Sequence, residues 1–328
     1  MRTFSGIQPT GSKHLGNFIG AIRGWVDGQD RGEAIYCLVD LHAITVPYEP
    51  AKLRETVLDA TAILIAAGLD PGRCILFRQS DVPEHTELTW LLNTVTAYGD
   101  LQRMTQFKEK SAKQKDLVSA GIFNYPILQA ADILAYNADE VPVGEDQRQH
   151  LELARDVAQR FNARFGETFV LPEARIPTVG ARIMDLQEPT NKMSTTAASD
   201  AGVIRVLDEP KTVEKKVKSA VTDSGSEVVR SPDKPGVTNL IDILAVIRDV
   251  GPEDIESEFN GSGYGQFKQA VAEAVVGYLA PVRERYNELR PDEEQLHAIL
   301  REGAEKAHAI AEPIVAQARD RMGVGPPS

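Results

Sequence analysis

The sequence predicts an α/β protein in which a parallel sheet flanked by helices is followed by an all-helical region. About the first 180 residues alternate short apolar runs with helical patterns, as in parallel sheets covered by helices. After Leu186 the chain turns polar and rich in Ser and Thr, and beyond that stretch apolar residues recur only at helical spacing. A chain of 328 residues is long enough for two domains, so we expect the boundary in this polar stretch.

Short apolar runs predict three strands in the first region, with helical patterns between and after them. The strands are expected at Arg2–Ile7, Ala34–Asp40 and Cys74–Ser80, and the helices are expected to begin near His14, Ala51 and Glu87. A later helix, from Glu145 to Arg164, is indicated by helical spacing of Leu151, Ala154, Ala158 and Phe161. Its first turn would be Glu145–Gln147.

Three longer helices are predicted in the second region. They span Leu240–Val250, Phe267–Leu289 and Gln295–Met322, and Pro235-Gly236 and Gly261–Gly265 punctuate them. The last helix carries an apolar face that we expect to pack back against the first domain, formed by Leu296, Leu300, Ala304, Ala307 and Ile310.

Composition and charge exclude several classes of protein. The N-terminus lacks an apolar signal core and no apolar stretch is long enough to span a bilayer, so we expect a cytoplasmic protein without a membrane segment. Cys37 and Cys74 show neither redox nor zinc spacing and are expected to be buried thiols. The net charge of −12 argues against a surface that grips nucleic acid everywhere, but it leaves two basic strips, Arg103–Lys115 and Lys211–Lys218.

Two short motifs could bind phosphate. The segment Gln8–Asn17 follows the first strand and opens the first helix, and a glycine-bearing turn there offers free backbone N–H groups. Taken alone, it is also typical of an ordinary strand–turn–helix junction. The second motif, Pro189–Thr196, is a polar loop about 175 residues downstream with one lysine, Lys192.

Together the two motifs resemble the ATP-binding signatures of class I aminoacyl-tRNA synthetases, since His14-Leu15-Gly16-Asn17 is followed in order by Lys192-Met193-Ser194. Further stretches are similar to the bacterial tryptophanyl-tRNA synthetases and span most of the chain: Phe4–Pro9, Val39–Thr45, Met104–Ser111, Val141–Gln147 and Lys234–Val237. The resemblance implies a tryptophan–tRNA ligase, which activates L-tryptophan with ATP to tryptophanyl-adenylate and pyrophosphate and then loads tRNA(Trp).

The resemblance also implies a domain plan. A Rossmann-like catalytic domain would cover 1–186, with a dimerisation insert at about 106–182, and a Lys-Met-Ser loop would cover 187–201. A helical anticodon-binding domain would follow at 202–292, then a C-terminal helix at 293–322 that packs back, and a disordered tail at 323–328. The family is homodimeric, so we expect a homodimer, and we hypothesise that the two basic strips meet tRNA phosphates.

Amino-acid activation needs no protein nucleophile, because the substrate carboxylate itself attacks the α-phosphorus of ATP. The protein aligns the reactants and stabilises charge. By resemblance, the catalytic residues are Lys110, Lys192 and Ser194. The ATP-binding residues are Gln8, Thr10, Gly11, His14, Gly16, Asn17, Gly144, Asp146, Gln147, Ile183, Lys192, Met193 and Ser194. Mg²⁺ would neutralise the triphosphate, and no protein metal site is expected.

Indole presents one N–H donor on a large apolar body, so its pocket should combine apolar walls with one buried acceptor. The resemblance assigns that acceptor to Asp132, although such an aspartate is by itself more typical of a helix surface. It places Phe4, His42, Val141 and Val143 along the indole slot, with Tyr125, Gln129 and Gln147 completing the tryptophan site.

Two positions depart from the family pattern. Gln129 stands where a methionine is expected, and Tyr125-x-x-x-Gln129-x-x-Asp132 is also similar to the tyrosine-binding helix of tyrosyl-tRNA synthetases. Tyrosine specificity is therefore an alternative. Thr195 replaces the second lysine of the Lys-Met-Ser-Lys-Ser loop, and losing one cation near developing charge would cost a few kcal/mol. A weakly active paralogue with a binding or regulatory role is the other alternative.

Overall fold

In the computed structural model, a five-stranded parallel sheet lies at the centre of the molecule. The structure describes residues 1–105, 118–144, 147–175, 182–194 and 199–326. Within these ranges the strands are β1 (Arg2–Ile7), β2 (Glu33–Leu38), β3 (Ile75–Arg78), β4 (Glu140–Pro142) and β5 (Glu173–Arg175), in the order β3-β2-β1-β4-β5. The chain moves outward from β1 to β3 and then returns to the other side of β1. The strand order therefore reverses between β1 and β4, where open α/β sheets place their ligands.

The first three strands lie where the sequence predicts them. The predicted second and third strands are each two residues too long at the carboxyl end, because Asp40 begins helix α3 and Gln79 begins a 3₁₀ turn. Strands β4 and β5 were not predicted, since three residues are too few to show an alternating pattern.

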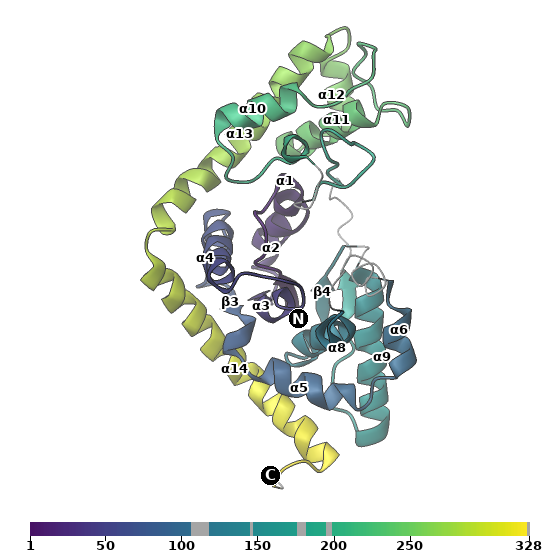
Figure 1. Ribbon diagram of the computed structural model, residues 1–328, viewed down its shortest axis with the longest axis vertical. Helices are drawn as coiled ribbons and strands as arrows, with labels where there is room; N and C mark the ends of the chain where they lie inside the picture. Colours follow the sequence, from purple (N-terminus) through teal and green to yellow (C-terminus); the bar gives the residue numbers. More distant parts are fainter. Residues whose placement is uncertain (106–117, 145–146, 176–181, 195–198, 327–328) are drawn as a thin grey trace.

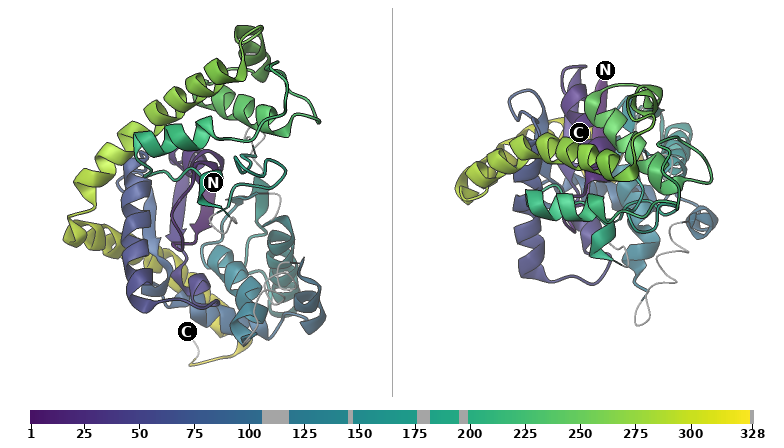
Figure 2. Two further views of the ribbon diagram at one scale, coloured as in Figure 1. Left: turned by 45° about the horizontal axis from the view of Figure 1, so that its top comes forward. Right: turned by 90° about the horizontal axis from the view of Figure 1, so that it is seen from above.

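Helices cover both faces of the sheet (Figures 1 and 2). On one face Tyr36, Leu38 and Leu76 pack against the helical run that follows β1 and against α4. On the other face Ile35, Cys37 and Phe77 pack against helices including α5, α8 and α9. This alternation is the two-residue period of a strand buried on both sides. The helices are α1 (Leu15–Asn17), the π-helical η1 (Phe18–Ile22), α2 (Arg23–Gly28), α3 (Asp40–Ala43), α4 (Pro50–Ala66), the 3₁₀ turn η2 (Gln79–Asp81), α5 (Glu84–Asn93), α6 (Tyr98–Arg103), α8 (Ala120–Leu134) and α9 (Arg148–Phe165).

Helix α9 begins at Arg148, with Gln147 as the residue that caps it. Gln147 itself has helical backbone angles and is assigned to a 3₁₀ turn, so it lies directly before the first residue of α9. Glu145 and Asp146, the other two residues predicted for the first turn, lie outside the described residues.

The rest of the described chain is helical. It contains η4 (Asp200–Gly202), α10 (Pro210–Lys218), α11 (Pro235–Arg248), α12 (Pro252–Glu258), α13 (Tyr264–Leu289) and α14 (Glu293–Met322). Figure 1 shows α10 to α12 gathered at one end and the two long helices α13 and α14 running along one side of the molecule. Proline occupies the first turn of α10, α11 and α12. N–H groups in the first turn have no partner within the helix, so proline, which has no N–H, costs no hydrogen bond there.

Helix α14 lies against β3 and closes both cores. Its buried Leu296 and Leu300 join the core beside α4, whereas Ala304 and Ala307 join the core beside α5. At Gly303 the backbones approach so closely that an added Cβ would lie 1.9 Å from the carbonyl oxygen of Leu76. Only glycine permits this contact.

The basic strip Lys211–Lys218 is only partly exposed on α10. Lys211, Lys215 and Lys218 face solvent, but Lys216 is buried and forms an ion pair of 2.8 Å with Asp208. The Nζ of Lys216 also donates to the carbonyl oxygen of Val203. The expectation that the whole strip is available to phosphate was therefore wrong at Lys216. Among the described helices, none is long and apolar enough to cross a membrane.

Candidate active site

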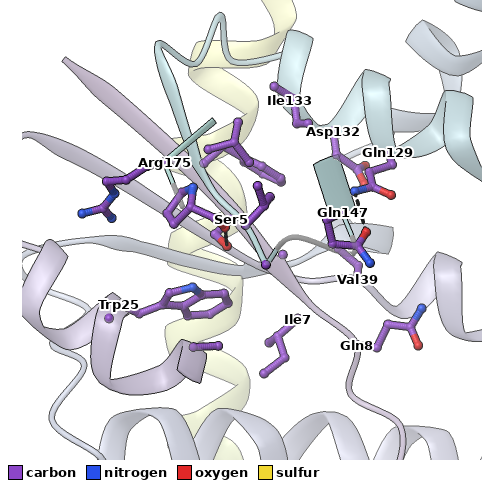
Figure 3. Close-up of a pocket in the computed structure, with 18 of the residues that line it drawn as sticks. Ser5, Ile7, Gln8, Trp25, Val39, Gln129, Asp132, Ile133, Gln147 and Arg175 are labelled. Carbon is purple, nitrogen blue, oxygen red and sulfur yellow. Dashed lines mark hydrogen bonds between the residues drawn. The ribbon is translucent and has the colours of Figure 1, made fainter. Parts of the chain in front are cut away.

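A cavity of about 830 Å³ opens at the carboxyl ends of β1 and β4, where the strand order reverses (Figure 3). Its wall includes Phe4–Gln8 from β1 and the residue that follows it, and Val141–Gly144 from β4 and the residues that follow it. All of the predicted tryptophan-site residues line this one cavity: Phe4, His42, Tyr125, Gln129, Asp132, Val141, Val143 and Gln147. Four predicted nucleotide residues line it as well, namely Gln8, Asn17, Gly144 and Gln147.

The carboxylate of Asp132 is held at the inner end of the cavity by three donors. His42 Nε2 lies 2.8 Å from Oδ2, while Gln79 Nε2 and His85 Nδ1 each lie 2.6 Å from Oδ1. The side chain is about 1% exposed, so Asp132 is not the surface carboxylate that its helical context alone would suggest. Three donors aimed at one carboxylate keep it an acceptor, while leaving acceptor capacity on Oδ2.

Two of the three donors are fixed in orientation by a second hydrogen bond. Gln79 Oε1 accepts from the backbone N–H of Leu41 at 3.1 Å, which turns its NH₂ toward Asp132. A carboxylate partner selects the His85 tautomer that carries its proton on Nδ1. In that tautomer Nε2 accepts from the hydroxyl of Tyr136 at 2.8 Å. Sequence reasoning missed Gln79 and His85, because only the fold brings them to Asp132 from 53 and 47 residues away.

The electrostatics favour an ionised Asp132. Burial alone would raise the pKa of this carboxyl, but the imidazoles of His42 and His85 outweigh burial and lower the pKa to about 2. Asp132 is therefore a carboxylate throughout the physiological pH range, and it can accept a further hydrogen bond but cannot donate one.

A group of polar side chains lies near the mouth of the slot. Gln129 Nε2 donates to Gln147 Oε1 at 3.3 Å, and the dashed line in Figure 3 marks this bond between helix α8 and the start of α9. The hydroxyl of Tyr125 lies 3.0 Å from His150 Nε2, and the Tyr125 ring meets His42 edge to face. Gln129 thus contacts Gln147, and its amide is not directed at Asp132.

The turn after β1 is organised around His14. His14 Nδ1 accepts from the backbone N–H of Asn17, and the Asn17 side chain accepts from the N–H of His14, which forms a reciprocal cap. Burial, followed by the nearby charges of Lys192 and Lys13, lowers the pKa of His14 to about 4, so the ring is neutral. At Gly16 an added Cβ would come within 3.1 Å of the His14 ring and 3.5 Å of Ile183.

The segment that carries the Lys-Met-Ser motif runs beside this turn. Lys192 pairs with Met184 in an antiparallel bridge, and Met193 donates to the carbonyl oxygen of Ile183. Asn239 of α11, which sequence reasoning also missed, clamps the backbone of Met184 with two hydrogen bonds of 2.8 and 3.0 Å. After the loop, the backbone N–H of Leu15 donates to the carbonyl oxygen of Ile204. The segment before the loop is thus held by Asn239 of α11, and the segment after it is held by the helix that follows the turn.

The remaining predicted residues lie in these two segments. Thr10, Gly11, His14 and Gly16 belong to the turn, while Ile183, Lys192, Met193 and Ser194 belong to the loop, where Ile183 and Met193 are buried. Lys110 and Asp146 lie outside the described residues, as does Thr195. In the described part of the chain, no cluster of three His, Cys, Asp or Glu side chains could hold a metal ion.

Comparisons with known proteins match this geometry. Residues 1–280 match the family model described as tRNA synthetases class I (W and Y). A "Tryptophan--tRNA ligase 2" of Streptomyces avermitilis is 54% identical, covering 99% of this chain and 97% of that protein. The crystal structure of tryptophanyl-tRNA synthetase from Mycoplasma pneumoniae superimposes with a TM-score of 0.92 at 36% identity, covering 99% of this chain and 98% of that chain.

A second crystal structure, tryptophanyl-tRNA synthetase from Campylobacter jejuni complexed with ADP and tryptophan, gives a TM-score of 0.85 at 36% identity. It covers 99% of this chain and 100% of that chain. The chain therefore belongs to the class I tRNA synthetase family of the tryptophan and tyrosine enzymes, and within it to the tryptophan branch.

Proposed function

We infer that this protein is a tryptophan–tRNA ligase, which joins L-tryptophan to ATP with release of pyrophosphate and then transfers tryptophan to tRNA(Trp). The observation that carries this inference is the buried Asp132 carboxylate, held as an acceptor by His42, Gln79 and His85 in a cavity with apolar walls. Such a site fits a ligand with one N–H donor on a large apolar ring. Its relatives bear the name of this activity.

In this proposal indole enters the cavity between Phe4, Val141 and Val143 and donates its N–H to Oδ2 of Asp132. Tyr125, Gln129 and Gln147 hold the α-amino group near the mouth. The α-carboxylate then faces Gln8 and Asn17, which connect the cavity to the turn around His14. Nucleotide phosphates placed at that turn would lie in line with the carboxylate.

The reaction requires alignment and no protein nucleophile. A tryptophan carboxylate oxygen forms a bond to the α-phosphorus, the bond from that phosphorus to the bridging oxygen breaks, and pyrophosphate leaves with the electron pair. Lys192, beside the turn, would stabilise the charge on the departing pyrophosphate, with Ser194 next to it. Lys110 and Asp146 enter the proposal through the sequence alone, as a further phosphate cation and as a ribose partner. Mg²⁺ would arrive with ATP as part of the substrate.

The site favours tryptophan over tyrosine. A phenol hydroxyl both donates and accepts, so a tyrosine pocket needs a donor beside its acceptor. Here His42, Gln79 and His85 direct their hydrogens at the carboxylate of Asp132. Gln129, the residue that suggested tyrosine, contacts Gln147 instead.

The proposed assembly follows the sequence plan. The catalytic domain (1–186, with its dimerisation insert at about 106–182) and the loop at 187–201 would perform activation, and 202–292 would meet the anticodon. Residues 293–322 would pack back on the catalytic domain. We propose a cytoplasmic homodimer on which one tRNA touches both subunits. Three lysines of the basic strip on α10 are exposed, and of these Lys211 and Lys215 are proposed to meet tRNA phosphates, because Lys218 pairs with Glu214.

The decisive test is ATP–pyrophosphate exchange with purified protein in the presence of tryptophan, tyrosine or no amino acid. Exchange with tryptophan alone is expected. Exchange with tyrosine would contradict the specificity inferred from Asp132. Tryptophan binding without exchange would favour the paralogue that binds but does not charge, and would direct attention to Thr195.

The tRNA contact has its own test. Reversing charge with Lys211→Glu and Lys215→Glu should weaken tRNA(Trp) binding and lower its dependence on salt, because each released phosphate contact contributes to the salt slope. Lys306→Glu, on α14, is the matched control. Unchanged affinity and unchanged salt slope in the double variant would remove α10 from the tRNA path.

A further inference from the structure

Lys13 is a buried lysine that forms no ion pair with any of the described carboxylates. It lies in the turn after β1, one residue before His14, and is about 6% exposed. Its Nζ donates to the backbone carbonyl oxygen of Gln8. Within the described residues no carboxylate lies within 4 Å of this ammonium group, as an ion pair would require. Burial lowers the pKa of Lys13 to about 8.

A second buried lysine shows what a purely structural role looks like. Lys216 is similarly buried, but its Nζ lies 2.8 Å from Asp208 and 3.3 Å from Asp200. Burying an unpaired ion costs several kcal/mol, whereas pairing offsets part of that cost. The fold therefore compensates Lys216 and leaves the charge of Lys13 uncompensated, which is the pattern of a group reserved for a ligand.

The position of Lys13 indicates the charge of that ligand. Its hydrogen-bond acceptor belongs to Gln8, which lines the cavity, and its own carbonyl oxygen accepts from Val206 just beyond the loop. Lys192 approaches the same turn from the Met184 bridge, and the charges of Lys13 and Lys192 both act on His14. The charges of two cations thus act on one neutral histidine in the turn between Gln8 and Asn17, both of which line the cavity. An anion completes this arrangement.

We propose that Lys13 is a catalytic residue whose ammonium group binds the β- and γ-phosphates of ATP and stabilises pyrophosphate as it leaves. This inference rests on the proposed function. It supplies, from the turn, the second cation that the loop lacks because Thr195 stands in place of a lysine. As the carboxylate–phosphorus bond forms and the bond to the bridging oxygen breaks, the electron pair passes to pyrophosphate beside the two ammonium groups. No proton is transferred.

The test is Lys13→Met, which keeps length and apolar volume and removes the charge. We expect kcat/KM for ATP in tryptophan-dependent exchange to fall by about 100-fold or more, as for other single transition-state donors. The KM for tryptophan should stay within about threefold, because Asp132 and its donors are untouched. Lys13→Arg should recover most of the loss. Retention of kcat/KM for ATP in Lys13→Met would overturn the proposal.

Stability separates a catalytic lysine from a structural one. Lys13→Met should unfold at the same temperature as the wild type or a higher one, because it removes an uncompensated buried charge. Lys216→Met, the matched control, should unfold at a lower temperature because it strands Asp208. A lower melting temperature in Lys13→Met, together with lost tryptophan affinity, would make Lys13 structural and refute the assignment.

Thr195→Lys tests whether Lys13 replaces the missing lysine. Introduced into Lys13→Met, it should restore exchange by about tenfold or more. No restoration would refute the replacement. If the wild type itself shows no exchange, the proposed function fails, and stabilisation by Mg–ATP in thermal unfolding then decides on Lys13 separately. Equal stabilisation of wild type and Lys13→Met would refute the phosphate contact, and a smaller shift in the variant would support it.

Discussion

Asp132→Asn tests the specificity of the cavity with almost no change in shape. In the wild type, Oδ1 accepts from Gln79 and His85, and Oδ2 accepts from His42. An asparagine can keep its single oxygen toward Gln79 and His85. Its NH₂ group then replaces Oδ2 and points a donor at the place where the indole N–H would lie, so that two donors face each other.

The magnitude follows from the lost bond. A hydrogen bond to a charged group contributes about 1.5–3 kcal/mol, and an unsatisfied buried donor costs about 1–3 kcal/mol. The lost hydrogen bond and the unsatisfied donor describe partly the same change, so their energies do not simply add. We therefore expect the free energy of tryptophan binding to weaken by about 2–4 kcal/mol, which is roughly 30- to 1000-fold in affinity. The pKa of Asp132, about 2, means that the wild-type carboxylate is ionised throughout any practical assay range.

The assay is exchange kinetics with tryptophan and with an analogue whose indole N–H is replaced by sulfur. Wild-type enzyme should prefer tryptophan by the same 30- to 1000-fold, about 2–4 kcal/mol. The variant should prefer tryptophan over the sulfur analogue by less than about threefold, since its side chain no longer accepts a hydrogen bond from the indole N–H. Asp156→Asn, at an exposed position of α9, is the control. A wild type that accepts both substrates equally, or a variant that keeps the discrimination, would refute the role of Asp132.

Three further outcomes are expected. Gly303→Ala should lower the free energy of unfolding by more than about 3 kcal/mol, because its Cβ would collide with the backbone of Leu76. The control Gly277→Ala, in open space on α13, should raise the free energy of unfolding by about 0.5–1 kcal/mol. Equal effects of the two substitutions in denaturant titrations would contradict the contact. Gln79→Leu should raise the KM for tryptophan about tenfold, as expected for one lost hydrogen bond, and an unchanged value would show that Gln79 does not orient Asp132. The pKa of His14 is lowered to about 4, so the free energy of unfolding of the wild type should fall by roughly 1–3 kcal/mol as the pH drops from about 6.5 toward 4. His14→Asn keeps the cap and should lack that loss. If the free energies of unfolding of the two proteins fell in parallel with pH, His14 would not be the cause.

The sequence predicted the parts of the fold that carry a periodic signal. Strand β1 lies where the apolar run predicts it, and the long helices α13 and α14 contain their predicted spans. Strands β4 and β5 gave no such signal, because their pairing with β1 and with each other comes from the fold around them. Strands as short as these are set by tertiary contacts more than by local preference.

The candidate site was predicted by motif and completed by the structure. Each residue placed in the tryptophan site by resemblance lines one cavity. Gln79, His85 and Asn239 were missed because nothing in their local sequence distinguishes them from core or surface residues, and their partners lie far along the chain. Lys216 was misassigned for the opposite reason, since its neighbours in sequence are exposed while its own side chain is paired and buried.

Helix α14 has a consequence for how the chain is made. His308 meets Glu84 across 224 residues of sequence, and Arg319 reaches Glu87 on the same helix α5. During synthesis on the ribosome the early strands emerge long before α14, the segment that covers them. Strand β3 therefore stays uncovered until the last helix has been synthesised. Two of the residues that hold Asp132 lie just after β3: Gln79 follows the strand directly, and His85 lies in the first turn of α5. Translation that stops before residue 293 therefore leaves the amino-acid site without its support, and an incomplete product is unfinished in the part that would recognise the substrate.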